Sequence, residues 1–467
     1  MSKKRANRER EKPAPAEGAE GRGRRKFLLA GLGGVGALAA AGLAGYQAGW
    51  FADKPPSAGP APAGTPAYPN DMNAVAKSHL APVRLPADAA NATRAADDIV
   101  RHYARELMSP SALIHLVRSD GREVKLADGS MVVDHLCERY FAEKEVNGKK
   151  FLYVPREFEV HENSFLKTFL EAGVSLDQPI RVGGNRYTLR DFSESAKALF
   201  RYDPQNPNRF EPTLYTQHLP WGLIAFSLIV PASQPTWINA WGEKINLNEV
   251  IDGTLGSYEL MCNGLHESLD RGEDESLEFR QQITKYSCYG MHSVYALFSC
   301  LRMGYRENRL EERIKEMYGL SIRRLIGDAK AIDREANAAK ELGPEMLNRL
   351  AVAQDGKVVT RGAAPSDTIE VMRLRSQIRF LGHAFEALNY AEVHRLFTPA
   401  AEEKKQWRAG EQLLFDYLVA LRATDLKPYW DWYSKFISNS VIAISHASRA
   451  LKLLTPANPD KPAVKAA

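Results

Sequence analysis

Two Cys-x3-His pairs, 26 residues apart, are the side chains of this sequence best suited to bind a metal ion. They are Cys262 with His266 and Cys288 with His292. Positions i and i+4 of a helix share a face, so each pair would present a thiolate beside an imidazole. If the two helices met in a hairpin, the four side chains could bind Zn²⁺ as a Cys2His2 site. Two alternatives are a site that uses only Cys288 and His292 with ligands from elsewhere, and four structural residues of the core.

A second group of titratable residues follows one face of a predicted helix over 367–397. His383 and Glu386 are three positions apart, and Tyr390 and His394 extend the same face, because eleven residues make about three turns. A His and a Glu on one face can act as acid and base or bind a metal ion. We therefore predict that His383 and Glu386 are catalytic and that Tyr390 contacts the substrate. The alternative is an exposed polar stripe.

His161 and Glu162 immediately precede another predicted helix, for which Asn163 or Ser164 would be the N-cap. Capping accounts for the Asn and the Ser but does not require the His-Glu pair. The N-terminal end of a helix carries a positive partial charge, and functional groups are common there. The pattern predicts that His161 and Glu162 are catalytic.

Aromatic residues near a further His are candidates for substrate binding. His218 precedes Pro220 and Trp221, and a Pro in this position is typical of a helix start. Trp237 lies in a predicted loop, where binding residues are concentrated. We predict that His218, Trp221 and Trp237 contact the substrate, although Trp221 could equally be a core anchor.

The elements that must position these residues are almost all helical. Apolar residues recur at i, i+3 and i+4 through most of the body, which indicates amphipathic helices. Strand signals are limited to two short hairpins, at 122–129 and 181–187. The sequence therefore predicts an all-α fold of stacked helical hairpins, arranged as an open solenoid or as a closed α/α toroid. Predicted helices cover 188–199, 221–230, 276–303, 309–325, 329–350, 367–397, 401–421 and 429–454.

The first 70 residues have the composition of a targeting segment and a linker. Arg24 and Arg25 precede an apolar run of 24 residues over 27–50, which is long enough to span a bilayer. The Pro-, Ala- and Gly-rich stretch at 53–70 predicts an extended tether. The predicted organisation is a signal or anchor at 1–52, the tether at 53–70, a helical domain at 71–455 and a disordered tail at 456–467.

The basic character of the chain comes from its targeting segment. Residues 1–26 contain ten Lys and Arg and four Asp and Glu, which leaves 52 positive and 53 negative residues in the rest of the chain. A nearly neutral body gives no electrostatic footprint for nucleic acid. The sequence also lacks a Gly-rich phosphate loop, a Gly-x-Ser-x-Gly elbow and a His-Glu-x-x-His motif.

The paired arginines and the Phe-Leu-Leu that follows Lys26 resemble a bacterial twin-arginine export signal. This resemblance implies that the twin-arginine export machinery carries the folded chain across the cytoplasmic membrane, to the periplasm or cell envelope. The segment at 27–50 could be cleaved or could remain as a membrane anchor.

The order of the motifs resembles a group of exported bacterial proteins of unassigned function. That order is His-Glu, Leu-Asp-x-Pro-Ile, a Trp helix, Trp-x-Asn-x-x-Gly, Cys-x-Gly-x-His and Gly-His-x-x-Glu, and it covers roughly residues 100–390. Members are similar to α/α-toroid proteins, the class of squalene cyclases and protein prenyltransferases, so the resemblance implies a toroid. Tyr289 and Met291 stand where the family has smaller residues. The Gly-His-x-x-Glu motif is also similar to one in sugar epimerases.

These observations lead to two hypotheses about function. In the first, an exported toroid carries its His, Glu and Cys residues in a central cavity and acts on, or binds, a carbohydrate or a lipid-linked substrate of the envelope, with a divalent metal such as zinc as a candidate cofactor. In the second, the chain is a non-catalytic helical scaffold tethered to the membrane, because helical solenoids provide protein-binding surfaces.

Overall fold

The computed structural model describes residues 78–460, except for 160, 208, 211–217, 274–275, 285, 342–363 and 434. The predicted signal, tether and membrane segment lie outside the described residues, as do 461–467. The described part consists mainly of α-helices with three two-stranded hairpins, which confirms the predicted all-α class.

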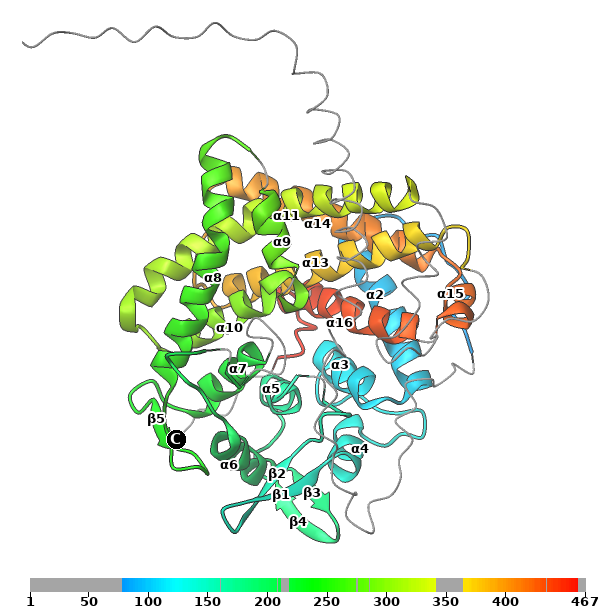
Figure 1. Cartoon of the computed structure of the whole chain (residues 1–467). Helices are drawn as coiled ribbons and strands as arrows, with labels where there is room; N and C mark the ends of the chain where they lie inside the picture. The colour runs from blue at the N-terminus through cyan, green and yellow to red at the C-terminus, as the bar shows by residue number, and fades with distance from the viewer. Residues whose placement is uncertain are drawn as a thin grey trace, which may run out of the picture.

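The longer helices form an inner set close to the centre of the molecule and an outer set around it (Figure 1). The inner helices are α3 (Pro110–Asp120), α5 (Ser164–Glu171), α7 (Leu219–Ile229), α10 (Met291–Arg302), α13 (Thr368–Val393) and α16 (Lys435–Leu453). The outer helices are α2 (Ala89–Leu107), α4 (Val132–Arg139), α6 (Leu189–Leu199), α8 (Leu247–Asp270), α11 (Leu310–Glu341) and α14 (Ala401–Arg422).

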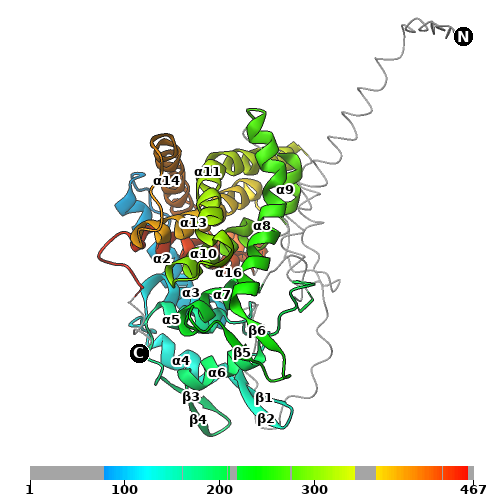
Figure 2. The ribbon, with the colours of Figure 1, turned by 90° about the vertical axis from the view of Figure 1, so that its left-hand side faces the viewer.

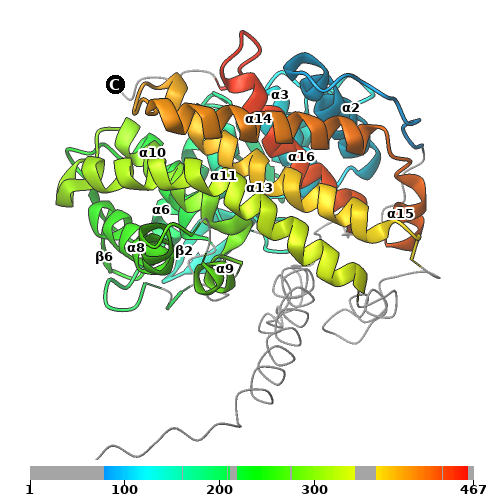
Figure 3. The same ribbon diagram turned by 90° about the horizontal axis from the view of Figure 1, so that it is seen from above.

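The contacts among the inner helices form a closed cycle. Each contacts the next in the order α3, α5, α7, α10, α13 and α16, and α16 contacts α3 again. Each outer helix contacts the inner helix that comes before it in the sequence, and α2, the first outer helix, contacts α16, the last inner helix. Figure 3 shows three of the longest helices, α11, α13 and α14, running side by side. Inner and outer helices therefore alternate along the chain.

The outer helices and the inner helices differ in how much of their surface is buried, as their sequences predict. The outer helix α2 buries one face, which includes Ala92, Ile99 and Tyr103, in the spacing of an amphipathic helix. The inner helix α7 is buried from Leu219 to Ser227 without a polar face, because other helices cover it on several sides.

The interface between α13 and α16 depends on Gly382. A Cβ atom at this position would lie 2.9 Å from the backbone nitrogen of Ala447 and 3.0 Å from its Cβ. We expect Gly382→Ala to lower the free energy of unfolding by about 1–3 kcal/mol, because backbone atoms cannot move aside cheaply. Gly256→Ala in α8 is the matched control, since a Cβ there meets nothing within 4 Å, and it should stabilise by up to about 1 kcal/mol. Chemical denaturation measures both, and equal effects would contradict this account of the interface.

The three hairpins lie at the edge of the helical body. They pair β1 (Ala142–Val146) with β2 (Lys149–Tyr153), β3 (Pro179–Val182) with β4 (Asn185–Thr188), and β5 (Thr236–Ile238) with β6 (Lys244–Asn246). Figures 1 and 2 show β1 to β4 together beside α4 and α6, far from α11 and α14.

The hairpin predicted at 181–187 is confirmed as the pair of β3 with β4. The turn is Gly183-Gly184, with φ of 55° and 88°, a left-handed conformation that suits glycine at both positions. The hairpin predicted at 122–129 is reduced to one bridge between Lys125 and Met131. The β1–β2 and β5–β6 hairpins, with strands of three to five residues, were not predicted.

Three predicted helix boundaries are wrong. The helix predicted at 276–303 is divided into α9 (Leu277–Ile283), a 3-10 turn at Ser287–Gly290 and α10. The helix predicted at 429–454 is divided into α15 (Lys427–Trp432) and α16. In contrast, the two helices predicted between 309 and 350 form the continuous helix α11 over its described residues. Helical periodicity on both sides of a short break does not reveal the break.

Candidate metal centre

A small cavity lies among the inner helices. Its volume of about 30 Å³ is enough for an ion or about one to two water molecules. Five of the inner helices, or the turns before them, contribute to its lining. The sixth, α13, does not line the cavity, but its His383 contacts the lining rings of His292 and His446. The lining includes His115, His161, Trp221, Cys288, His292 and His446.

Three potential metal ligands meet at one side of this cavity. The ligand atoms of Cys288, His292 and His383 all lie within 4.8 Å of one another, and all three residues are buried. Among the described residues these three form the group of His, Cys, Asp and Glu that could hold a metal ion. Two imidazoles and a thiolate are a donor set typical of zinc.

The backbone turn before α10 determines where Cys288 lies. Cys288, Tyr289 and Gly290 have φ of 52°, 57° and 73°, so the chain passes through three successive left-handed residues before the helix starts. Such backbone conformations cost about 1–3 kcal/mol at each non-glycine residue and occur preferentially at functional sites. Arg379 Nη2 contacts the Cys288 sulfur at 3.6 Å, which places a positive charge beside the thiol.

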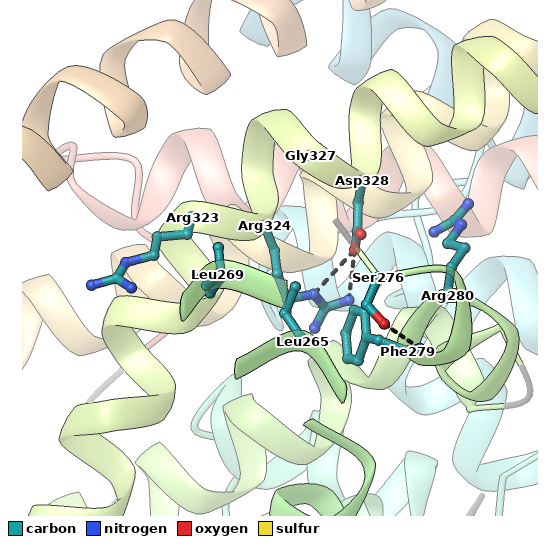
Figure 4. Close-up of a pocket in the computed structure, with 9 residues that line it drawn as sticks. All are labelled: Leu265, Leu269, Ser276, Phe279, Arg280, Arg323, Arg324, Gly327 and Asp328. Carbon is teal, nitrogen blue, oxygen red and sulfur yellow. Dashed lines mark hydrogen bonds and ion pairs between the residues drawn. The ribbon is translucent and has the colours of Figure 1, made fainter. Parts of the chain in front are cut away.

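A polar cluster between α8, α9 and α11 supports this turn (Figure 4). Arg324 binds the carboxylate of Asp328 at 2.8 Å and donates a second hydrogen bond, at 2.9 Å, to the carbonyl oxygen of Tyr289. The guanidinium of Arg280 lies over the ring of Tyr289. The space within this cluster is only about 10 Å³, so the cluster is a structural support and not a ligand cavity.

The orientation of His383 leaves one ring nitrogen available as a ligand. Its Nδ1 lies 2.6 Å from the carbonyl oxygen of Arg379, and a carbonyl can only accept, so Nδ1 carries the proton. Nε2 is buried and has no hydrogen-bond partner. Metal-binding histidines are held in the same way, with the second ring nitrogen bonded to a carbonyl or carboxylate.

The rings around the cavity are in direct contact. His383 stacks on His446 with centroids 3.6 Å apart, and His161 stacks on Trp221 at 3.7 Å. His292 lies between the two stacks, 4.2 Å from Trp221 and 4.7 Å from His383. Trp221 is therefore both a buried anchor and part of the cavity wall.

Burial keeps the imidazoles of this cluster neutral at physiological pH. It lowers the pKa of His383 to about 3 and that of His115 to about 4. The pKa values of His292 and His446 are also well below the ordinary value, first because of burial and then because of neighbouring imidazoles. A neutral imidazole retains the lone pair that binds a metal ion.

Glu386 is the centre of a group of buried charged side chains, here called the charged layer, one helical turn along α13 from His383. The layer also contains Arg118, Arg449, Glu171 and Lys167. Its carboxylate accepts hydrogen bonds from Arg118 Nε and Arg449 Nη1, both at 2.8 Å, and from His446 Nδ1 at 2.6 Å. Burial alone would raise the pKa of the Glu386 carboxyl, but the charges of Arg118 and Arg449 hold it below its ordinary value. Glu171 accepts from Arg118 and from Lys167 in the same layer.

The two sequence-predicted catalytic pairs have different surroundings. His383 and Glu386 lie together at the centre, although Glu386 binds His446 and not His383. His161 lines the cavity, whereas Glu162 is exposed and lies on the other side of the chain, in a second cavity. Asn163 is the N-cap residue of α5, but it makes no side-chain cap hydrogen bond.

The four-ligand Cys2His2 arrangement is not formed, because Cys262 and His266 do not join Cys288 and His292. Cys262 contacts Tyr258 on α8, and burial raises the pKa of its thiol to about 12. His266 is partly exposed and faces Glu316 at 3.7 Å. Cys288 precedes α10, so it is not on a helix with His292 as predicted.

The predicted substrate contacts are also divided. His218 has its Nδ1 3.2 Å from the backbone nitrogen of Glu162 and lines the second cavity. Tyr390 is buried one turn beyond Glu386 and accepts a hydrogen bond from Arg302. Trp237 lies on β5, where it donates to the carbonyl oxygen of Lys197 and packs against Phe226, outside both cavities.

Sequence reasoning missed a repeated spacing that could have identified the centre. Four inner helices each carry a histidine ring at the cavity and, three positions later, a polar residue in or beside the charged layer around Glu386. Residues i and i+3 lie on one face of a helix. The four pairs are His115 with Arg118, His292 with Tyr295, His383 with Glu386 and His446 with Arg449.

Comparisons with known proteins add no functional assignment to this geometry. No protein-family model matches the chain, and no similar curated protein or solved structure was found. In the part of the chain that the structure describes, none of the helices combines the length and apolar composition needed to cross a membrane.

Proposed function

We propose that the six pairs of helices form an α/α toroid. The closed cycle of contacts from α3 through α16 supports this arrangement. The alternation of outer and inner helices along the chain is the connectivity that stacked helical hairpins would produce.

We propose that this toroid is an exported metalloenzyme that acts on a carbohydrate or a lipid-linked substrate of the cell envelope. The observation that carries the proposal is the convergence of Cys288, His292 and His383 beside a small cavity. Zn²⁺ held by three protein ligands keeps a fourth position for water or substrate and acts there as a Lewis acid.

The surrounding residues have distinct roles in this proposal. Arg379 fixes the ring of His383 through its carbonyl and lies beside the sulfur of Cys288. Glu386 orients the ring of His446, which lines the cavity. His115 is held by the carbonyl oxygen of Ser111 at 2.6 Å. These hydrogen bonds to the second ring nitrogen fix the orientations of the imidazoles, as outer-shell residues do at metal sites.

Matched cysteine variants test the proposed metal site. We expect wild-type protein, purified with added zinc and then desalted, to retain about one zinc per chain, because three protein ligands are the usual set at catalytic zinc sites. Cys288→Ala should lose most of the metal, whereas Cys262→Ala should retain it, since only Cys288 belongs to the group. Elemental analysis by mass spectrometry measures the stoichiometry.

Two outcomes would contradict the proposal. Loss of zinc in Cys262→Ala with retention in Cys288→Ala would place the metal elsewhere. A wild-type protein that holds no stoichiometric zinc, copper, iron or manganese would reject the metalloenzyme and leave the tethered scaffold as the remaining hypothesis.

A further inference from the structure

A short partition segment (residues 158–159 and 161–164) separates the metal-centre cavity from a second, larger cavity. Phe158, His161 and Ser164 line the first cavity. Glu159, Glu162 and Asn163 line the second, which has a volume of about 260 Å³. Successive residues of one segment therefore face two chambers, and the larger chamber has no role in the metal site itself.

The lining of the second cavity combines flat apolar surfaces with charged groups. Tyr153, Phe192 and Phe210 supply aromatic rings, and Lys144 and Arg156 supply positive charges. Cavities of a few hundred cubic ångströms with an apolar lining and few polar groups are typical of small-ligand sites. The volume is suited to one sugar ring and not to a polymer.

The carboxyl groups in this cavity have unequal environments. Glu159 is only 4% exposed, and its Oε1 accepts hydrogen bonds from the backbone N–H of Phe165 at 2.7 Å and from Ser164 Oγ at 3.3 Å. Burial raises the pKa of Glu159 to about 8, so this group is mainly a neutral acid at pH 7. The Glu162 side chain is more exposed, and partial burial of its carboxyl still raises the pKa, against the lowering effect of Lys144 and Arg156.

The charges of the lining favour a negatively charged ligand. The cations Lys144 and Arg156 line the same cavity as two carboxyl groups, and burial raises the pKa of both Glu159 and Glu162, which weakens their compensation of the positive charges. His218 adds no charge at neutral pH, because burial lowers its pKa to about 3. A protonated carboxyl can donate a hydrogen bond to a hydroxyl or an anionic oxygen. Aromatic rings pack against the apolar faces of sugars.

We propose that this second cavity binds one monosaccharide unit that carries an anionic group, held by Lys144 and Arg156, with Glu159 as a hydrogen-bond donor to the sugar. The inference takes only its substrate class, an envelope carbohydrate, from the proposed function. It makes the cavity a recognition site next to the candidate metal centre, separated from it by the partition segment.

Ligand-observed NMR with the full-length protein tests this inference. The probes are glucuronate, glucose 1-phosphate and uncharged glucose, which separate a carboxylate from a phosphate as the recognised anion. We expect one or both anionic sugars to bind at least about tenfold more tightly than glucose, because a hydrogen bond to a charged group has this magnitude. Equal affinity for all three, or binding of none, would overturn the proposal.

Variants of the lining locate the binding. Lys144→Met and Arg156→Met should each reduce the affinity for the preferred anionic sugar about tenfold towards that of glucose. Lys149→Met is the matched control, since Lys149 is exposed on the same hairpin as Lys144 but does not line the cavity. A loss in Lys149→Met equal to that in Lys144→Met would reject the cavity as the site.

The metal variant distinguishes this inference from the proposed function. Cys288→Ala should still bind the anionic sugar, because Cys288 lines only the first cavity. A protein that binds zinc but none of the sugars would overturn the inference alone. A protein that binds the sugar but no metal would overturn the metalloenzyme and leave the sugar site in place.

Discussion

Glu386→Gln should lower the free energy of unfolding by about 3–5 kcal/mol. The carboxylate of Glu386 accepts from Arg118, Arg449 and His446, and all of these groups are buried. Removing one member of a buried ionic network leaves the remaining charges without compensation, which is strongly destabilising. Denaturation by urea, followed by circular dichroism, measures the change.

The matched control for this variant is Glu392→Gln on the same helix, where the side chain is exposed. Its effect should be within about 0.5 kcal/mol of zero. If both variants lost the same stability, Glu386 would not be the centre of the charged layer.

The loss in Glu386→Gln should also depend on pH in a defined direction. The charges of the two arginines hold the pKa of Glu386 below its ordinary value in spite of burial. The ionised carboxylate therefore contributes its full stability above the unfolded pKa of about 4.3, and the contribution falls as pH drops below it. The stability difference between wild type and Glu386→Gln should shrink on acidification. A difference that grew below pH 4 would contradict this assignment.

His383→Ala should weaken zinc binding by more than about 100-fold. Even loss of a residue that only orients a ligand reduces metal affinity about 10- to 100-fold, and in the proposed site His383 supplies a ligand atom itself. Competition with a chromophoric chelator measures the affinity. His383→Gln serves as a second variant that fills more of the space, so that a folding defect in the alanine variant cannot be mistaken for loss of a ligand.

His394→Ala provides the control for the histidine variants. His394 caps the same helix and contacts Tyr390, but it lies outside the ligand group. Zinc affinity within about twofold of wild type is the expected result. If His394→Ala and His383→Ala weakened binding equally, the effect would come from helix α13 as a whole and not from a ligand.

Much of the helical architecture could be predicted from local patterns. The capping box at Thr188 and Asp191 forms with both of its hydrogen bonds, and α7 is buried on several sides as its continuous apolar sequence indicates. These features depend on residues within one or two turns of each other. The break before α10 could not be predicted, because Arg324, 35 residues away, supplies the hydrogen bond that supports the left-handed turn.

The candidate centre could be predicted only in part. His383, Cys288 and His292 were recognised as chemically suited residues, but their grouping depends on contacts between α10 and α13 that no local pattern specifies. His115 and His446 were missed since neither is part of a recognised motif. Glu159 was missed because a buried carboxyl has the same sequence appearance as an exposed one.

The closure of the helical cycle has a consequence for the order of folding. Glu386 binds Arg118 across 268 positions of the chain, and Lys452 binds Asp120 across 332. Contacts between such distant positions form late, since long loops must close first. The charged layer cannot be completed on a partly synthesised chain, because Arg449 lies on α16, so ribosome-bound fragments that end before α16 should lack this layer.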